Sequence, residues 1–102
     1  MVQCSDTFAA LGDATRLEIV DRLAAGPLSV SELAEPFEMS LRGVLKHVQV
    51  LEDAGLVRTA KSGRTRRCVL QREQLDEAAA WVESVRHRWT CLLYTSPSPR
   101  DS

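Results

Sequence analysis

The apolar residues of this chain recur mostly three and four positions apart, a spacing that is typical of amphipathic helices. A short first helix is predicted over residues 7–11. Asp13 is a candidate N-cap for a second helix, which Gly26 and Pro27 are expected to end. The apolar positions of the second helix are Leu17, Val20, Leu23 and Ala24. The beginning of the chain is therefore predicted to be helical.

The next segment carries start and stop signals for two more helices. Ser29 and Glu32 form a capping-box pattern before a third helix. Ser40 is a candidate N-cap for a fourth helix of about residues 40–54, and Gly55 supplies a C-terminal stop. The apolar stripe of the fourth helix consists of Leu41, Val44, Leu45, Val48 and Leu51. Two helices in this arrangement, joined by a short turn, have the pattern of a helix-turn-helix.

Residues 56–70 are predicted to form a β-hairpin directly after the fourth helix. Short strands are expected over residues 56–60 and 66–70, on either side of a basic loop. A last helix is predicted to start near Gln74. The predicted fold class is therefore mainly α with a β-hairpin wing, a winged helix-turn-helix. Residues 1–90 are expected to form this single domain, with the first and last helices at its two ends.

The net charge of −1 conceals a strong separation of charge along the chain. Residues 1–39 carry seven acidic and two basic side chains, whereas residues 40–67 carry seven basic and two acidic ones. A cationic block of this size is often no more than a solvated face. Here it coincides with a helix start and a hairpin tip, so we interpret it as the footprint of a polyanion.

The composition is that of an ordinary globular domain, with 44% hydrophobic and 26% charged residues. The apolar runs are too short to span a bilayer, and no signal-peptide pattern opens the chain. Cys4, Cys68 and Cys91 are odd in number and widely spaced, which favours reduced, inert thiols over a disulfide framework. We therefore expect a soluble protein of the cytoplasm.

The fourth helix and the hairpin carry the candidate DNA contacts. A helix fits the major groove, and its N-terminal turns reach base edges and phosphates. The helix residues expected to face DNA are Ser40, Arg42, Gly43, Lys46 and His47. The wing residues expected to contact the DNA backbone or a minor groove are Lys61, Arg64 and Arg66. Because Arg66 and Arg67 alternate across a strand, only one of them is expected to face DNA.

Three positions in the fourth helix need separate interpretation. Gly43 destabilises a helix by about 1 kcal/mol relative to Ala, and its lack of a side chain would permit close approach of the backbone to DNA. His47 fits an ordinary surface histidine as well as it fits a DNA contact. Leu45 is assigned to the core or to subunit packing rather than to base reading.

The last helix predicts a dimer. The alternating spacing of three and four residues that marks a two-helix seam is followed by Leu75, Ala78, Val82, Val85 and Trp89. Phe8 and Leu11 on the first helix are candidates for the same interface. The alternative is that the last helix packs onto the core of its own domain. In a dimer, two fourth helices would address half-sites about one turn of DNA apart.

Several motifs are similar to those of one family of bacterial repressors. They read L-G-D-x-T-R-L-x-I, S-V-S-E-L-A and K-H-V-x-V-L-E-x-A-G-L-V, with G-R in the wing. Over residues 8–89 the chain resembles the ArsR family of winged-helix repressors. The resemblance implies a homodimer in the bacterial cytoplasm, at the nucleoid, that binds an operator palindrome through the fourth-helix residues named above. Many members have serine where this chain has Leu45.

Metal sensing, the best-known activity of that family, is not implied for this chain. Members that sense arsenite or cadmium carry Cys-x-Cys in the third helix, where this chain reads VSELAEPF. Zinc sensors need paired ligands along the last helix, and Asp76, Glu83 and His87 do not reproduce their spacing. The chain resembles instead the non-metal branch often encoded beside SRPBCC-type ligand-binding proteins. We expect no metal and no cofactor, and the residues do not specify an effector.

The end of the chain has a different character. Residues 91–101 read CLLYTSPSPRD and lack the periodicity of the preceding helix, which is expected to break off there. This string resembles the translation of a transposase sequencing adapter. We therefore expect residues 91–102 to be a non-native tail and the gene fragment to stop near Thr90.

A dimeric DNA-binding transcriptional repressor is the function that these residues favour. A winged helix used only for protein contacts is the alternative, because the fold serves both uses, but the basic wing and Lys46 disfavour it. An enzyme is not expected. The sequence has no nucleophile–base pair with recognisable spacing and no glycine-rich phosphate loop, and its histidines are His47 and His87.

Overall fold

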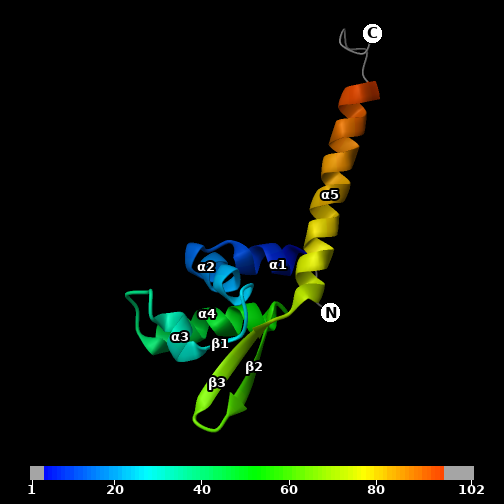
Figure 1. The fold of residues 1–102 in the computed structure, drawn as a ribbon. Coiled ribbons are helices and arrows are strands. Elements are labelled where there is room, and N and C mark those ends of the chain that lie inside the picture. The colour runs from blue at the N-terminus through cyan, green and yellow to red at the C-terminus, as the bar shows by residue number, and fades with distance from the viewer. Residues whose placement is uncertain (1–3, 96–102) are drawn as a thin grey trace.

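The fold is that of a computed structural model, which describes residues 4–95. Its helices are α1 (Cys4–Leu11), α2 (Ala14–Leu23), α3 (Val30–Ala34), α4 (Leu41–Asp53) and α5 (Arg72–Thr95). Its strands, β1 (Leu28–Ser29), β2 (Val57–Ser62) and β3 (Thr65–Leu70), form an antiparallel sheet in the order β1-β3-β2. Figure 1 shows α1–α4 packed into a body, with the β2–β3 hairpin projecting from one end and α5 leading away from the other. The predicted fold class, mainly α with a hairpin wing, is confirmed.

The predicted helix caps are all present. The Asp13 carboxylate accepts a hydrogen bond from a backbone N–H in the first turn of α2, at 3.1 Å. Ser40 Oγ accepts from the backbone N–H of Gly43, also at 3.1 Å. The capping box is complete, because Ser29 Oγ accepts from the Glu32 N–H at 3.1 Å and the Ser29 N–H donates to Glu32 Oε1 at 2.8 Å. These bonds satisfy N–H groups that a helix start otherwise leaves unpaired.

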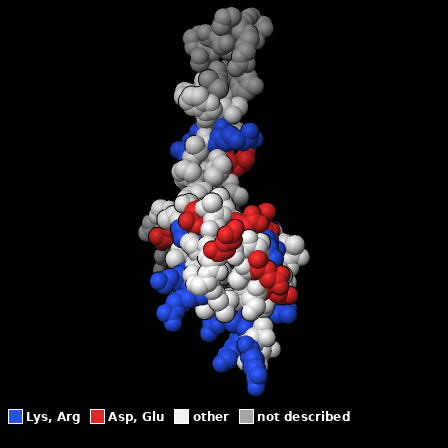
Figure 2. Space-filling view, turned by 90° about the vertical axis from the view of Figure 1, so that its left-hand side faces the viewer, with Lys and Arg blue, Asp and Glu red and all other residues white. Residues whose placement is uncertain are grey.

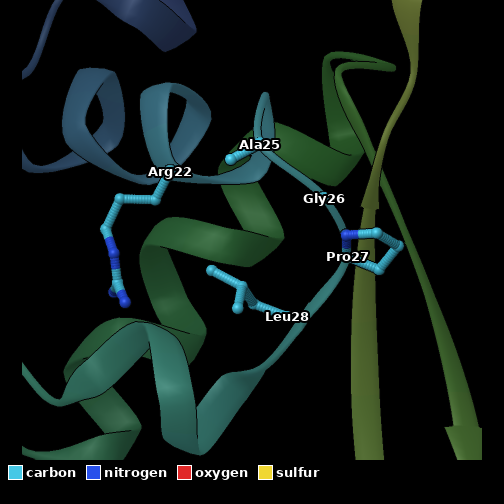
Figure 3. Close-up of a pocket in the computed structure, with 5 residues that line it drawn as sticks. All are labelled: Arg22, Ala25, Gly26, Pro27 and Leu28. Carbon is cyan, nitrogen blue, oxygen red and sulfur yellow. The ribbon is translucent and has the colours of Figure 1, made fainter.

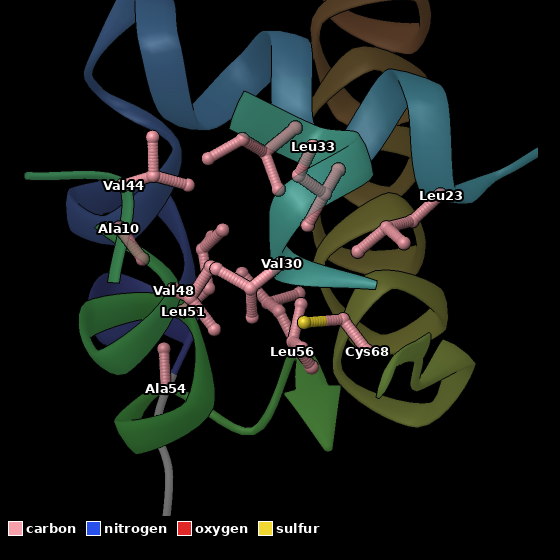
Figure 4. Packing of buried hydrophobic residues seen from close by; sticks show 12 residues of the cluster. Ala10, Leu23, Val30, Leu33, Val44, Val48, Leu51, Ala54, Leu56 and Cys68 are labelled. Atoms are coloured by element: carbon pink, nitrogen blue, oxygen red, sulfur yellow. The ribbon is translucent and has the colours of Figure 1, made fainter. Parts of the chain in front are cut away.

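The core lies between α4 and the elements packed around it (Figure 4). α4 contributes Val44, Val48 and Leu51, each at most 2% exposed. The residues that surround them are Ala10, Ile19, Leu23, Val30, Leu33, Ala54, Leu56, Val57 and Cys68. Burial of a single valine or leucine side chain contributes roughly 1.5–3 kcal/mol. This packing anchors α4 by one side and leaves its other side free.

Three leucines that were predicted on buried faces are exposed. In α4, Leu41 and Leu45 are 48% and 38% exposed, so their assignment to the core stripe is wrong. In α2, Leu17 is 53% exposed, whereas Ile19 is fully buried. The physical reason in α2 is that Ile19 and Leu23, four residues apart, share the inward face of the helix.

The sheet differs from the predicted hairpin in two ways. β1 was not predicted, and it pairs with β3 so that Ser29 lies opposite Arg67. The expected basic loop of residues 61–65 is shorter, because β2 and β3 continue toward each other and leave a turn of two residues. The first of these is Gly63, with φ of 63°, a left-handed conformation that suits glycine in a tight hairpin turn.

α5 is longer than predicted at both ends. It begins at Arg72 rather than near Gln74, and it continues to Thr95 without breaking off after Thr90. Its first turns pack on the body, where Ala78 is buried. Residues 96–102 of the expected non-native tail lie outside the described residues. No helix within residues 4–95 has the length and apolar character needed to cross a membrane.

Candidate nucleic-acid interface

α4 presents a cationic surface on the side away from the core. Arg42 and Lys46 are both exposed, and their spacing of four residues places them on one side of the helix. Gln49 continues this surface and donates a hydrogen bond to Asp53 at 2.9 Å. The cations therefore stand at the N-terminal half of α4, the half that a recognition helix directs at base edges.

The first turn of α4 is built around Ser40 and Gly43. The Ser40 side chain is exposed, but its oxygen already accepts the capping hydrogen bond. Gly43 is half-buried, and a Cβ added there would lie 3.5 Å from Met39 Sδ and 3.6 Å from Ser40 Oγ, which are ordinary contact distances. The protomer itself therefore does not require glycine at this position.

His47 lies on the α2 side of α4 and is partly buried, so its predicted outward position is wrong. Arg16 Nη1 donates to His47 Nδ1 at 3.3 Å, and an Asp13 carboxylate oxygen lies 3.8 Å from the same nitrogen. The guanidinium of Arg16 also donates to the carbonyl of Ala10, at the end of α1, at 2.6 Å. These residues belong to the D-x-T-R motif and its contacts, and they join α1, α2 and α4. His47 therefore links α4 to α2 within the protomer, and its contact with DNA stays a prediction.

A chain of hydrogen bonds fixes the wing to the end of α4. Glu52 Oε2 accepts from the hydroxyl of Thr59 at 3.1 Å, and the Thr59 oxygen accepts from Arg66 Nη1 at 3.1 Å. The Thr59 backbone N–H also points at Glu52 Oε2, at 3.4 Å. The wing thus has a defined orientation relative to α4. Sequence reasoning missed this link because Glu52 and Thr59 belong to different elements.

The wing separates its basic residues onto two faces. Lys61 and Arg66 are opposite each other in the β2–β3 register, so their side chains share one face. Arg67 follows Arg66 and points to the other face, as strand alternation requires. Arg64 occupies the second position of the hairpin turn and is exposed. Lys61, Arg64 and Arg66 are therefore the wing cations arranged around the side and tip that adjoin α4.

The basic and acidic side chains occupy different parts of the surface. Figure 2 shows Lys and Arg gathered over the wing and the adjoining end of the body, Asp and Glu over the middle of the body, and a separate group of Lys and Arg on α5. The exposed cations of α4 and the wing are Arg42, Lys46, Arg58, Lys61, Arg64, Arg66 and Arg67. The charge separation seen along the sequence is thus a separation in space, with one strongly positive end.

A hollow of about 380 Å³ lies between the end of α2 and β1 (Figure 3). Apart from Arg22, it is lined by Ala25, Gly26, Pro27 and Leu28, none of which has a polar side chain. Its one charged lining residue, Arg22, donates through Nη1 to the carbonyls of Glu32 and Leu33, at 3.1 and 3.0 Å. Arg22 therefore holds the C-terminal end of α3, and the hollow offers little polar chemistry for a ligand.

A second exposed surface is apolar and follows α1 and α5. The rings of Phe8 and Trp81 meet edge to face, with their centroids 5.5 Å apart. Further along α5, Val82, Val85 and Trp89 are exposed. Of the residues predicted at a dimer seam, Ala78 is buried in the protomer, and Leu11 and Leu75 are partly buried against its core; their place in a dimer seam stays a prediction. Trp81 was missed because it falls outside the alternating three-four spacing.

The described cysteines lie outside the cationic surface of α4 and the wing; Cys91 is exposed on α5, where its sulfur is 3.5 Å from His87 Nε2. Cys68 is fully buried in the core, and this burial raises the pKa of its thiol. Cys4 lies on α1, where its sulfur is 3.8 Å from the Glu77 carbonyl oxygen. Within residues 4–95, no group of three or more His, Cys, Asp and Glu side chains is arranged to hold a metal ion.

A capped helix anchored by one side, cationic on the other and followed by a basic hairpin defines a winged helix-turn-helix protein. A family model of a helix-turn-helix domain matches residues 11–60. The HTH-type transcriptional regulator Rv2034 of Mycobacterium tuberculosis is 50% identical over 86 residues, which cover 84% of this chain and 78% of that protein. The arsenical resistance operon repressor of Staphylococcus xylosus is 36% identical, over 72% of this chain and 71% of the repressor.

Solved structures agree with these sequence matches. The ArsR family transcriptional regulator RHA00566 is 40% identical and superposes with a TM-score of 0.81, over 88% of this chain and 97% of that one. A homodimeric winged helix-turn-helix DNA-binding domain from Mycobacterium bovis is 28% identical, with a TM-score of 0.65 over 81% and 77% of the two chains. The chain belongs to the ArsR family of winged helix-turn-helix transcriptional regulators. It is a regulator of transcription and not an enzyme.

Proposed function

We propose that this regulator is a homodimeric repressor that binds an operator palindrome. The observation that carries this proposal is the positive end of the molecule, where the cations of α4 and of the wing stand together. α4 would enter the major groove with Arg42 and Lys46 at base edges or phosphates. The wing would place Lys61, Arg64 and Arg66 on the adjacent backbone or minor groove.

The other residues of the proposed interface affect how α4 is held and how closely DNA can approach it. Ser40 caps α4 and presents the positive end of the helix to a phosphate. Gly43 would allow the DNA backbone close to α4, which supplies the reason for a glycine that the protomer does not need. His47 would act indirectly, by holding α4 against Arg16.

The proposed dimer uses the apolar surface of α1 and α5. The exposed side chains that support it are Phe8, Trp81, Val82, Val85 and Trp89. The related domain from Mycobacterium bovis is homodimeric, and the related arsenical resistance regulator is a repressor. A two-fold dimer would place two copies of α4 in successive major grooves, so its site would be a palindrome. DNA binding also supports a location at the nucleoid in the bacterial cytoplasm.

The test is a gel-shift titration with duplexes that the full chain has selected from a random pool. Because each neutralised phosphate releases counterions, the logarithm of the binding constant should fall by about 0.9 per contact for each tenfold rise in salt. Arg42→Ala, Lys46→Ala and Arg64→Ala should each make this slope shallower. Arg86→Ala, which removes a charge from α5, is the control and should leave it unchanged.

Two results would refute the proposal. One is that no duplex shifts even at low salt. The other is that a chain carrying all three alanine substitutions binds as tightly as the original. Either result would favour a winged helix that serves only protein contacts. The exposed cations on the wing argue against that use, because together with the cations of α4 they form one positive end of the molecule, which suits a polyanion.

A further inference from the structure

Two leucines stand exposed beside the cations of α4. Leu41 and Leu45 are four residues apart, so they lie on one side of the helix. The core contacts of α4 are made by Val44, Val48 and Leu51, whereas Leu41 and Leu45 remain 48% and 38% exposed. Their side of the helix adjoins the wing, whereas Arg42 and Lys46 point further outward. Their exposure on the proposed DNA-binding surface therefore calls for a binding role.

The two leucines line a groove of about 300 Å³ between α4 and the wing. Across the groove lie Arg64, Thr65 and Arg66, and the start of α3 completes its wall. The residues that line the groove all belong to the part of the chain that the structure describes, and none of them is acidic. Its occupant must therefore combine negative charge for the arginines with an apolar group for the leucines.

A DNA duplex supplies both features. Phosphates provide the charge, and the C5 methyl group of thymine is the apolar group that base pairs expose in the major groove. We propose that Leu41 and Leu45 read thymine methyl groups at the base pairs that face the wing side of α4. This inference rests on the proposed function, since it requires α4 to lie in the major groove.

The experiment replaces thymine by deoxyuridine, which differs only by loss of the methyl group. Duplexes selected by the full chain are substituted one thymine at a time, and binding is measured by gel shift. At one or two positions in each half-site, the substitution should weaken binding about 4-fold, the effect of one buried methyl group. At those positions Leu41→Ala or Leu45→Ala should remove the penalty.

Matched variants separate this inference from general damage. Leu17→Ala removes an exposed leucine from α2, away from the groove, and should keep the full deoxyuridine penalty. The α4 leucine variants should also keep the salt dependence of the original chain, because they remove no charge.

The possible failures are distinguishable. If no duplex binds with a salt-dependent affinity, the proposed function itself fails. If duplexes bind, but deoxyuridine weakens the leucine variants as much as the original chain, thymine reading is refuted and the proposed DNA binding stands. Unchanged affinity of Leu41→Ala and Leu45→Ala for thymine-containing DNA would also refute it, and would leave the groove to a different occupant.

Discussion

At the scale of single residues, Asp13 and Glu32 make the fold sensitive to acid. A backbone hydrogen bond from Arg16 lowers the pKa of Asp13, and one from Ser29 lowers the pKa of Glu32. A carboxylate whose pKa is lower in the folded state stabilises the fold fully above its unfolded pKa, near 4. That contribution is lost as the pH falls through the folded pKa.

We predict that Asp13→Asn together with Glu32→Gln reduces the loss of stability in acid. Both amides keep an oxygen that can accept the capping hydrogen bond, but neither titrates. Thermal unfolding followed by circular dichroism between about pH 6 and pH 3 should show a smaller fall in Tm for the double variant. Asp21→Asn with Glu38→Gln, which replaces exposed carboxylates that cap no helix, should leave the fall unchanged. Equal falls in all three proteins would contradict the prediction.

At the scale of elements, α4 contains one residue, Gly43, that disfavours the helical conformation. We predict that Gly43→Ala raises the free energy of unfolding by about 0.5–1 kcal/mol, because alanine is the better helix former and its Cβ fits the available space. The same change should weaken DNA binding if the backbone approaches DNA there. Chemical denaturation and gel shift measure the two effects on one protein.

In the wing, by contrast, the backbone conformation favours glycine. Gly63 has a positive φ, so Gly63→Ala should destabilise the fold even though nothing lies within 4 Å of the added Cβ.

If Gly43→Ala gains stability and still binds DNA at full strength, close approach at Gly43 is refuted. A loss of stability in Gly43→Ala would contradict the expectation that a Cβ fits at this position.

The elements also show which features a sequence can predict. Caps at Asp13, Ser29 and Ser40 depend on residues within one turn, so they were predicted correctly. The exposure of Leu41 and Leu45 depends on where the wing and α3 lie, and no local periodicity contains that information. β1 is two residues long and exists only because β3 pairs with it. The wrong predictions therefore concern features that depend on contacts between distant parts of the chain. The position of His47 is one of these features.

At the scale of the whole molecule, α5 is the element whose apolar surface stays largely exposed in a single chain. A helix of 24 residues is about 36 Å long, and its outer half leaves the body (Figure 1). Its exposed Val85 and Trp89 continue the surface that begins with Phe8 and Trp81. Full burial of a large apolar side chain contributes roughly 1.5–3 kcal/mol, so a partner helix that covers the exposed part of each of these would stabilise α5 by a fraction of that amount per residue.

We therefore predict that Val85→Glu separates the proposed dimer into folded monomers, because a buried, unpaired carboxylate is far less favourable than a packed valine. Sedimentation equilibrium should give the mass of one chain, while circular dichroism keeps the signal of the body helices. The salt slope of DNA binding should fall to about half, since only one protomer supplies cations. Ala80→Glu is the control, because residue 80 is exposed about 140° around the helix from residue 85. A Val85→Glu protein that stays dimeric, or an Ala80→Glu protein that dissociates equally, would place the interface elsewhere.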